Sequence, residues 1–263
     1  METITSVSNQ KVKELVCLMK DRAFREESGL FVVEGALLAS EAAKSKYVVR
    51  SVYCTERAHE KYRGAVAAAV LKSESAFIIT NRIAEKLSGL STPQGVFTVL
   101  EEGGEYAPDA VAAKRRAIVL DSVRDPANLG AISRSALAFG FDALAVSPDC
   151  ADWRSDKAQR AAMGALLHCC VSVCETGEII PLLRERGFAV YAAALGRETR
   201  RPDGFPKSGK LALVIGNEAS GLGEDVVSLC DAAVGIPTDT RMMSLNAAAA
   251  AAVLMYCFSG VGA

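Results

Sequence analysis

Apolar residues recur along this chain in two patterns, as short unbroken runs and at helical spacing. The run Ile118-Val119-Leu120 predicts a buried strand, and a polar turn follows it over residues 121–128. From Gly130 the apolar residues recur at helical spacing, and Gly140 marks the predicted end of that helix. Residues 143–146 supply the next apolar run. The centre of the chain is therefore predicted to form a strand, a helix and a second strand.

The same alternation of strands and helices continues on both sides of this central unit. Residues 101–114 interrupt it with acidic residues, glycines and a proline but no apolar period, which predicts a linker. We therefore predict an α/β fold with a front domain over 1–100, a linker over 101–114 and a second domain over 115–263. The remaining predicted strands cover 30–33, 47–54, 76–79, 96–100, 168–173, 188–193, 211–215 and 232–236. The first predicted helix begins at Ser8 or Asn9, and a charged turn is predicted over 21–28. Further helices are predicted over 36–44, 56–71, 81–87, 155–163, 177–186, 225–229 and 244–258.

Composition narrows the class of protein. The 263 residues are 50% hydrophobic with a net charge of −1, so the chain is predicted to be globular and lacks an overall basic field for non-specific nucleic-acid binding. Eight cysteines without paired C-x-x-C spacing predict reduced thiols in a cytoplasmic protein. No apolar run approaches the roughly 20 residues of a membrane span. The cluster of His168, Cys169, Cys170 and Cys174 lies on a predicted strand whose neighbours alternate between faces, so we predict no metal.

Three loops follow three predicted strands, over residues 121–128, 216–223 and 237–243. In open α/β sheets ligands bind outside the carboxyl ends of the strands, so all three loops are candidates for one site. Glycines in the second loop allow close backbone approach to a ligand, although the loop matches neither G-x-G-x-x-G nor the P-loop pattern. From spacing alone the alternative is a nucleotide-dependent oxidoreductase, but the fingerprint of its cofactor domain is missing.

Individual side chains in these loops allow a structural and a functional interpretation. Arg134 stands six residues after Asn128, at the same predicted strand end, where an anionic ligand would fit. The structural alternative makes Asn128 and Ser244 helix caps and Arg134 a solvated helix residue. Glu218 is expected either to be buried against a charged partner or to be exposed.

Three motifs stand in order at the predicted strand ends. They are 125–132 with Arg134, 214–218 with Gly221, and 236–237 followed by Ser244-Leu245-Asn246. Together they resemble the SpoU, or TrmH, family of SPOUT RNA methyltransferases, which transfer a methyl group from S-adenosylmethionine to a ribose 2′-hydroxyl. Residues 157–164 resemble a short helix and glycine of that family, and 31–35 and 92–96 resemble its ribosomal-protein-like RNA-binding front domain.

The resemblance implies a fold, partners and residue roles. The second domain is expected to form a trefoil knot and an obligate homodimer with the site at the subunit interface. Arg134 is expected to position RNA phosphate and stabilise developing alkoxide charge, because a guanidinium is a poor proton acceptor at neutral pH. Asn128, Ser244 and Asn246 would orient groups around it, and Glu218 would hold the loop or the dimer partner. The residues expected to bind S-adenosylmethionine are Gly196, Gly216, Asn217, Ile236, Leu245 and Asn246.

The third motif departs from the family pattern. Thr238, Thr240 and Met243 stand where the family usually has methionine, glycine and glutamate. This departure keeps a second interpretation open, an RNA-binding protein of the same fold with little catalysis. For the enzyme, structured ribosomal RNA is favoured over transfer RNA because a folded front domain is present.

Overall fold

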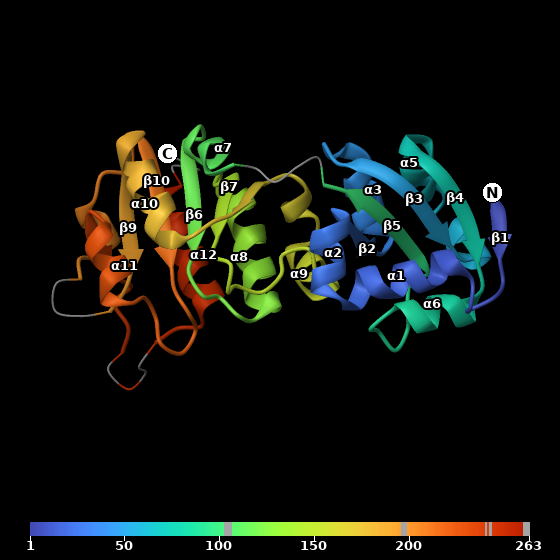
Figure 1. The fold of residues 1–263 in the computed structure, drawn as a ribbon. Helices are drawn as coiled ribbons and strands as arrows, with labels where there is room; N and C mark the ends of the chain where they lie inside the picture. Colours follow the sequence, from blue (N-terminus) through green and yellow to red (C-terminus); the bar gives the residue numbers. More distant parts are fainter. Residues whose placement is uncertain (103–106, 196–198, 240, 242–243, 260–263) are drawn as a thin grey trace. The chain divides into compact units, whose positions relative to one another are not determined.

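The computed structural model describes residues 1–102, 107–195, 199–239, 241 and 244–259 (Figure 1). These residues pack as two compact units. The first unit combines 1–104 with 152–167, and the second combines 105–151 with 168–263. Each unit has its own β-sheet.

The first unit is built on a five-stranded sheet in the order β1-β4-β3-β5-β2. Strands β1 to β4 run in one direction and β5 runs against them, so the loop before β5 joins the carboxyl ends of the others. The strands are β1 (Glu2–Ile4), β2 (Leu30–Glu34), β3 (Val48–Cys54), β4 (Ser73–Ile79) and β5 (Val96–Glu101), and the helices are α1 (Gln10–Lys20), α2 (Arg22–Ser28), α3 (Ala36–Lys44), α4 (Glu56–Lys61), α5 (Arg63–Lys72), α6 (Asn81–Leu87) and α9 (Asp156–Ala162).

The second unit is built on a six-stranded parallel sheet in the order β11-β9-β10-β6-β7-β8. Each of its two central strands begins with an arginine or lysine and is otherwise apolar and buried, as expected for a parallel sheet covered on both faces. The strands are β6 (Arg116–Leu120), β7 (Ala143–Val146), β8 (Cys170–Val173), β9 (Phe188–Ala193), β10 (Lys210–Ile215) and β11 (Ala232–Val234), and the helices are α7 (Pro108–Ala112), α8 (Pro126–Ala138), α10 (Thr176–Glu185), α11 (Glu224–Leu229) and α12 (Ala247–Phe258).

The last helix reaches the middle of the second sheet. Helix α12 packs against α8 and β10, although it is the final element of the chain (Figure 1). The predicted trefoil knot requires the chain to thread through a loop near this helix. Residues 196–198, 240 and 242–243 lie outside the described residues, so the knot stays a prediction.

Four local predictions are wrong. Residues 21–28 form helix α2, because the Asp21 carboxylate accepts a hydrogen bond from the Phe24 backbone N–H and so caps a helix start. Strand β1 was not predicted, the helix expected over 56–71 is divided at Tyr62 into α4 and α5, and α7 lies within the stretch interpreted as a linker. These segments are short, charged or alanine-rich, so the spacing of their apolar residues is a weak signal for secondary structure.

A segment from the middle of the sequence, residues 152–167, belongs to the first unit by its packing. The Trp153 ring lies 5.6 Å from the Phe31 ring, centre to centre. Two ion pairs also hold the segment, Arg25 with Asp152 at 2.7 Å and Arg154 with Glu102 at 2.6 Å, and all four side chains are at most 8% exposed. The linear division at residue 114 assigns this segment to the second domain, whereas its contacts place it with the front strands.

Candidate active site at the strand ends of the second unit

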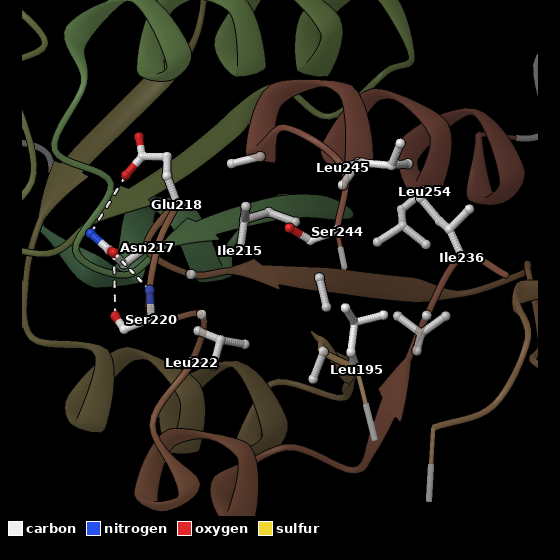
Figure 2. Close-up of a pocket in the computed structure, with 18 of the residues that line it drawn as sticks. Leu195, Ile215, Asn217, Glu218, Ser220, Leu222, Ile236, Ser244, Leu245 and Leu254 are labelled. Carbon is white, nitrogen blue, oxygen red and sulfur yellow. Dashed lines mark hydrogen bonds between the residues drawn. The ribbon is translucent and has the colours of Figure 1, made fainter. Parts of the chain in front are cut away.

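A pocket of about 370 Å³ opens at the carboxyl ends of β9, β10 and β11. Figure 2 shows Leu195, Ile236 and Leu254 around its apolar part, with Glu218 and Asn217 at the other side of the view. None of its described lining residues is a lysine or arginine. The lining residues are Ala193, Ala194, Leu195, Ile215, Gly216, Asn217, Glu218, Ala219, Ser220, Gly221, Leu222, Val234, Gly235, Ile236, Thr238, Ser244, Leu245, Ala247, Ala250 and Leu254.

The loop after β10 is a tight turn closed on itself. The backbone groups of Asn217 and Gly221 exchange two hydrogen bonds, of 3.1 and 3.0 Å. The Asn217 side-chain oxygen accepts from the Ala219 and Ser220 N–H groups, and its amide group donates to the Ser122 carbonyl at 2.8 Å. Asn217 is thus committed to shaping the loop through both its side chain and its backbone.

Gly216 is required by a close backbone approach within the same turn. A Cβ atom placed on Gly216 would lie 2.5 Å from the Gly221 carbonyl carbon, a separation that real side chains do not adopt. Gly221 itself has a φ of +69°, in the left-handed region that glycine enters without steric cost. The predicted need for glycine in this loop therefore has a steric basis at these two positions.

Glu218 is exposed but held by four donors, one of which is the side-chain amide of the neighbouring Asn217 at 3.5 Å. Its carboxylate accepts from the Asn128 side-chain amide at 2.9 Å and from the backbone N–H groups of Arg124 and Asp125. Partial burial alone would raise the pKa of Glu218, but these hydrogen bonds outweigh it and hold the pKa below its usual range. Of the two expectations for Glu218, the exposed one is confirmed. The contacts join the loop after β10 to the loop after β6.

Asn128 continues this chain of hydrogen bonds to the last helix. Its side-chain oxygen accepts from the Asn246 amide at 3.1 Å. Neither Asn128 nor Ser244 is a helix cap, so both structural interpretations are wrong. Asp125 caps α8, where Pro126 occupies the first turn, and Asn246 caps α12 by accepting from two backbone N–H groups.

The other predicted site residues fall in different places. Gly216, Asn217, Ile236 and Leu245 line the pocket together with Glu218 and Ser244, whereas Arg134, Asn128 and Asn246 do not line it. Arg134 is exposed on α8 and forms no hydrogen bond or ion pair with any residue the structure describes, so its guanidinium can bind a ligand. Gly196, Thr240 and Met243 lie outside the described residues.

Some contributors to the site carried no usable sequence signal. Ser122 adopts a φ of +56° and presents its carbonyl to Asn217, and Leu222 and Leu254 complete the apolar wall. A serine in a polar turn and two ordinary leucines resemble many others in the chain. Of these three residues only Ser122 lay in a stretch predicted to be part of the site, the polar turn over 121–128.

The described residues contain no group of three or more His, Cys, Asp or Glu side chains placed to hold a metal ion. Their eight cysteines are free thiols, five of which are buried. The helices that can be described are all too short or too polar to cross a membrane.

Two parts of the chain match known families. Residues 115–256 match the SpoU rRNA Methylase family. The chain belongs to that family. Residues 9–98 match the MRM3-like substrate binding domain, which corresponds to the front part of the first unit. The chain is therefore an RNA methyltransferase of the SpoU family with a substrate-binding domain before its methylase domain.

Individual relatives share the same arrangement over nearly the whole chain. The chain is 28% identical over 260 residues to the 23S rRNA (guanosine(2553)-2′-O)-methyltransferase RlmP of Bacillus subtilis, covering 99% of this chain and 100% of that protein. A putative RNA methyltransferase of the TrmH family from Porphyromonas gingivalis is similar with a TM-score of 0.82 and 27% identity over 96% and 98% of the two chains. An AdoMet-bound rRNA methyltransferase from Sinorhizobium meliloti, at 24% identity over 98% and 97% of the two chains, shares the fold with a TM-score of 0.87.

These comparisons confirm the main predictions from sequence. The SpoU/TrmH family, the α/β fold with a front substrate-binding domain, and an S-adenosylmethionine-dependent RNA methyltransferase are confirmed. The oxidoreductase alternative is wrong, because the family match covers the loops on which it rested.

Proposed function

We propose that this chain methylates ribose 2′-hydroxyls of ribosomal RNA, and that the pocket at the ends of β9, β10 and β11 binds S-adenosylmethionine. The observation that carries the proposal is the adjacency of this apolar pocket to the hydrogen-bonded chain Glu218–Asn128–Asn246. The similarity to a 23S rRNA 2′-O-methyltransferase over the whole chain supports the substrate class.

The pocket fits the proposed cofactor in size and chemistry. Its volume of about 370 Å³ lies within the range of small-molecule sites, roughly 300–1,000 Å³. Backbone N–H and carbonyl groups of the turn at Gly216 and of Ile236 and Leu245 would hold polar groups of the ligand, and Leu195 and Leu254 would cover its aromatic ring. S-adenosylmethionine, when bound, supplies an electrophilic methyl group on a sulfonium.

The residues around the pocket have separate proposed roles. Arg134 positions an RNA phosphate and stabilises negative charge on the ribose oxygen as its proton leaves. A guanidinium stays protonated at neutral pH, so Arg134 does not act as the base. Asn128, Ser244 and Asn246 orient groups beside it. Glu218 fixes the loop after β10 through its hydrogen bonds to the loop after β6 and the first turn of α8.

We also propose that the enzyme works as a homodimer through α12. Ala249, Val253 and Tyr256 are exposed at a spacing of four and three residues, which forms an apolar stripe along one helix face. The Tyr256 ring packs against the Phe139 ring at 5.8 Å, which extends the apolar surface onto the end of α8. Sedimentation of Tyr256→Glu should show a monomer if this face joins the subunits. The predicted cytoplasmic location stays a prediction.

The test is transfer of labelled methyl from S-adenosylmethionine to unmodified ribosomal and transfer RNA pools. We expect label on the ribosomal pool, and alkali-resistant dinucleotides in the digest if the 2′-oxygen carries it. Arg134→Ala should lower the rate by about 10²-fold to 10³-fold with cofactor affinity unchanged.

Arg186→Ala provides the matched control. Arg186 is an exposed arginine of the same unit, and its only ion pair among the described residues is with Asp109 at the surface, so this variant should keep full activity. Label on transfer RNA alone would reverse the substrate assignment. Cofactor binding without label on either pool would favour the RNA-binding protein of low activity, and full activity in Arg134→Ala would remove the proposed role of that arginine.

A further inference from the structure

A second cavity, of about 390 Å³, lies wholly within the first unit. It opens where β3 and β4 end and β5 begins, so three segments distant in sequence meet there. Its lining residues are Thr55, Arg57, Ala58, Lys61, Tyr62, Asn81, Ala84, Glu85, Ser91, Thr92, Pro93, Gln94 and Gly95. The cofactor proposed above does not involve this cavity.

Two cations at this cavity have no acidic partner within the described part of the chain. Arg57 and Lys61 are exposed, and neither forms an ion pair with any described residue, although Glu85 also lines the cavity. The Lys61 ammonium lies 5.1 Å from the centre of the Tyr62 ring. Two unpaired cations beside an aromatic ring suit a ligand that carries both negative charge and a flat π-face.

The same cavity presents side-chain amides. The Gln94 side-chain oxygen accepts a hydrogen bond from the Ala36 backbone N–H at 3.0 Å, which fixes the amide and leaves its NH₂ group to donate. Asn81 is exposed and makes no side-chain hydrogen bond with the residues described, so it can both donate and accept. Amide groups of this kind match the hydrogen-bonding edges of nucleic-acid bases.

The loop that closes the cavity is fixed at both ends. The Ser88 hydroxyl donates to the buried Glu34 carboxylate at 2.7 Å, and the Leu90 N–H donates back to Ser88. At the other end Gly95 has a φ of +75°, and a Cβ atom there would lie 2.7 Å from the Thr55 hydroxyl. The wall formed by residues 91–95 is therefore a positioned element of the site.

We propose that this cavity binds one unpaired nucleotide of the RNA substrate, with its base stacked on Tyr62, its edge hydrogen-bonded by Asn81 and Gln94, and its phosphates held by Arg57 and Lys61. The proposal rests on the proposed function and names what the front domain recognises. A base within a helix is covered on both faces, so a stacking site of this kind selects a bulged or looped nucleotide.

The full chain should be tested for binding of unmodified ribosomal RNA, and for photo-cross-linking to the same RNA carrying 4-thiouridine. Tyr62→Leu should weaken binding about tenfold and raise the KM for RNA with kcat and cofactor affinity unchanged, because base stacking is lost. Tyr62→Phe keeps the ring and should bind as the parent chain does. The cross-link should map to residues 55–62 or 91–95.

Arg57→Ala and Lys61→Ala test the phosphate contacts. Each should make the slope of log affinity against log salt shallower by about 0.7. Arg63→Ala, an exposed neighbour that does not line the cavity, is the matched control and should leave the slope unchanged. If Arg63→Ala changed the slope as much as Arg57→Ala and Lys61→Ala do, the RNA would be contacting a diffuse basic surface, and the proposed site would be wrong.

The two proposals fail in different ways. Methyl transfer that continues with an unchanged KM in Tyr62→Leu would overturn the nucleotide site and leave the proposed function standing. Weaker RNA binding by Tyr62→Leu, with no methyl transfer by the parent chain, would support the site and count against the proposed function. Cross-links confined to other segments, or no RNA binding at all, would also overturn the site.

Discussion

The second-unit pocket and the first-unit cavity occupy equivalent places in two different sheets and have opposite chemistry. Both lie where parallel strands end, at β3 and β4 in the first unit and at β9, β10 and β11 in the second. The second-unit pocket has leucine and isoleucine walls and no cation among its described lining residues, whereas the first-unit cavity has Arg57 and Lys61. Strand ends create the hollow, and the loop side chains decide what it binds.

The loops of the two sites are also stiffened differently. The turn after β10 is held by its own asparagine and by backbone contact between Gly216 and Gly221. The loop over 88–95 is held from outside, through Ser88 to the buried Glu34. Arg160 lies 3.6 Å from the same carboxylate, so the segment 152–167 supports the first-unit cavity. Because the two loops are held by separate contacts, we expect that a substitution can impair one site and leave the other intact.

The largest effect is expected from Arg154→Ala. Removing this side chain leaves the Glu102 carboxylate, 8% exposed, without its 2.6 Å partner, and breaking such a buried pair costs about 3–5 kcal/mol. Urea unfolding should show the first unit weakened by that amount while cofactor affinity is unchanged. Arg22→Ala, which removes an exposed pair within one helix, should cost about 0.5 kcal/mol or less. Equal losses in the two variants would contradict the structural role of the segment.

The next effect is expected in the second-unit pocket, from Gly216→Ala. The added methyl group would lie 2.5 Å from the Gly221 backbone, and overpacking of this kind typically costs about 1–3 kcal/mol. Calorimetry should show cofactor affinity lowered at least about tenfold, with RNA binding retained. Gly177→Ala serves as the control, because its Cβ would meet open space in α10. Unchanged cofactor affinity in Gly216→Ala would mean that this turn does not form the binding wall.

A smaller effect is expected from Asn128→Asp, which keeps shape but replaces a donor with a charge. The new carboxylate would face Glu218, whose oxygen is 2.9 Å from the present amide nitrogen, so the two loops should separate. Methyl transfer should fall about tenfold. Asn9→Asp is the matched control, because Asn9 only accepts a hydrogen bond at its helix start and Asp does this equally well. Equal activity in both variants would show that the Glu218 contact is dispensable.

The parts of this structure that follow from local sequence could be predicted. Unbroken apolar runs such as 211–215 identified buried strands, and two of the three loop motifs contribute lining residues to the second-unit pocket. The helix caps were misassigned because Asp125, Asn128, Ser244 and Asn246 are all suitable residue types, and only three-dimensional structure decides which one meets free N–H groups. The first-unit cavity could not be predicted, because residues 55–62, 81–85 and 91–95 come together only through the sheet.

The smallest expected effect is a difference in pH dependence between the carboxylates that support the two sites. Burial raises the pKa of Glu34 above 4.5, and the hydrogen bond from Ser88 opposes this shift. Burial also raises the pKa of Asp156, and the neighbouring Arg160 opposes that shift. A carboxyl whose folded pKa is raised contributes stability below its unfolded pKa and loses it as pH rises through the folded pKa. The first unit should therefore weaken as pH increases through the raised pKa values of these two carboxyls.

Glu218 should behave in the opposite sense. Its lowered pKa means that its contribution is present above pH 4.5 and is lost as pH falls through the folded pKa. The urea midpoint of the first unit should fall with rising pH across this range, and Glu34→Gln should make that fall shallower. Glu218→Gln should instead reduce the loss of second-unit stability at acid pH. The same slope in Glu34→Gln as in the parent chain would show that Glu34 is ionised without penalty.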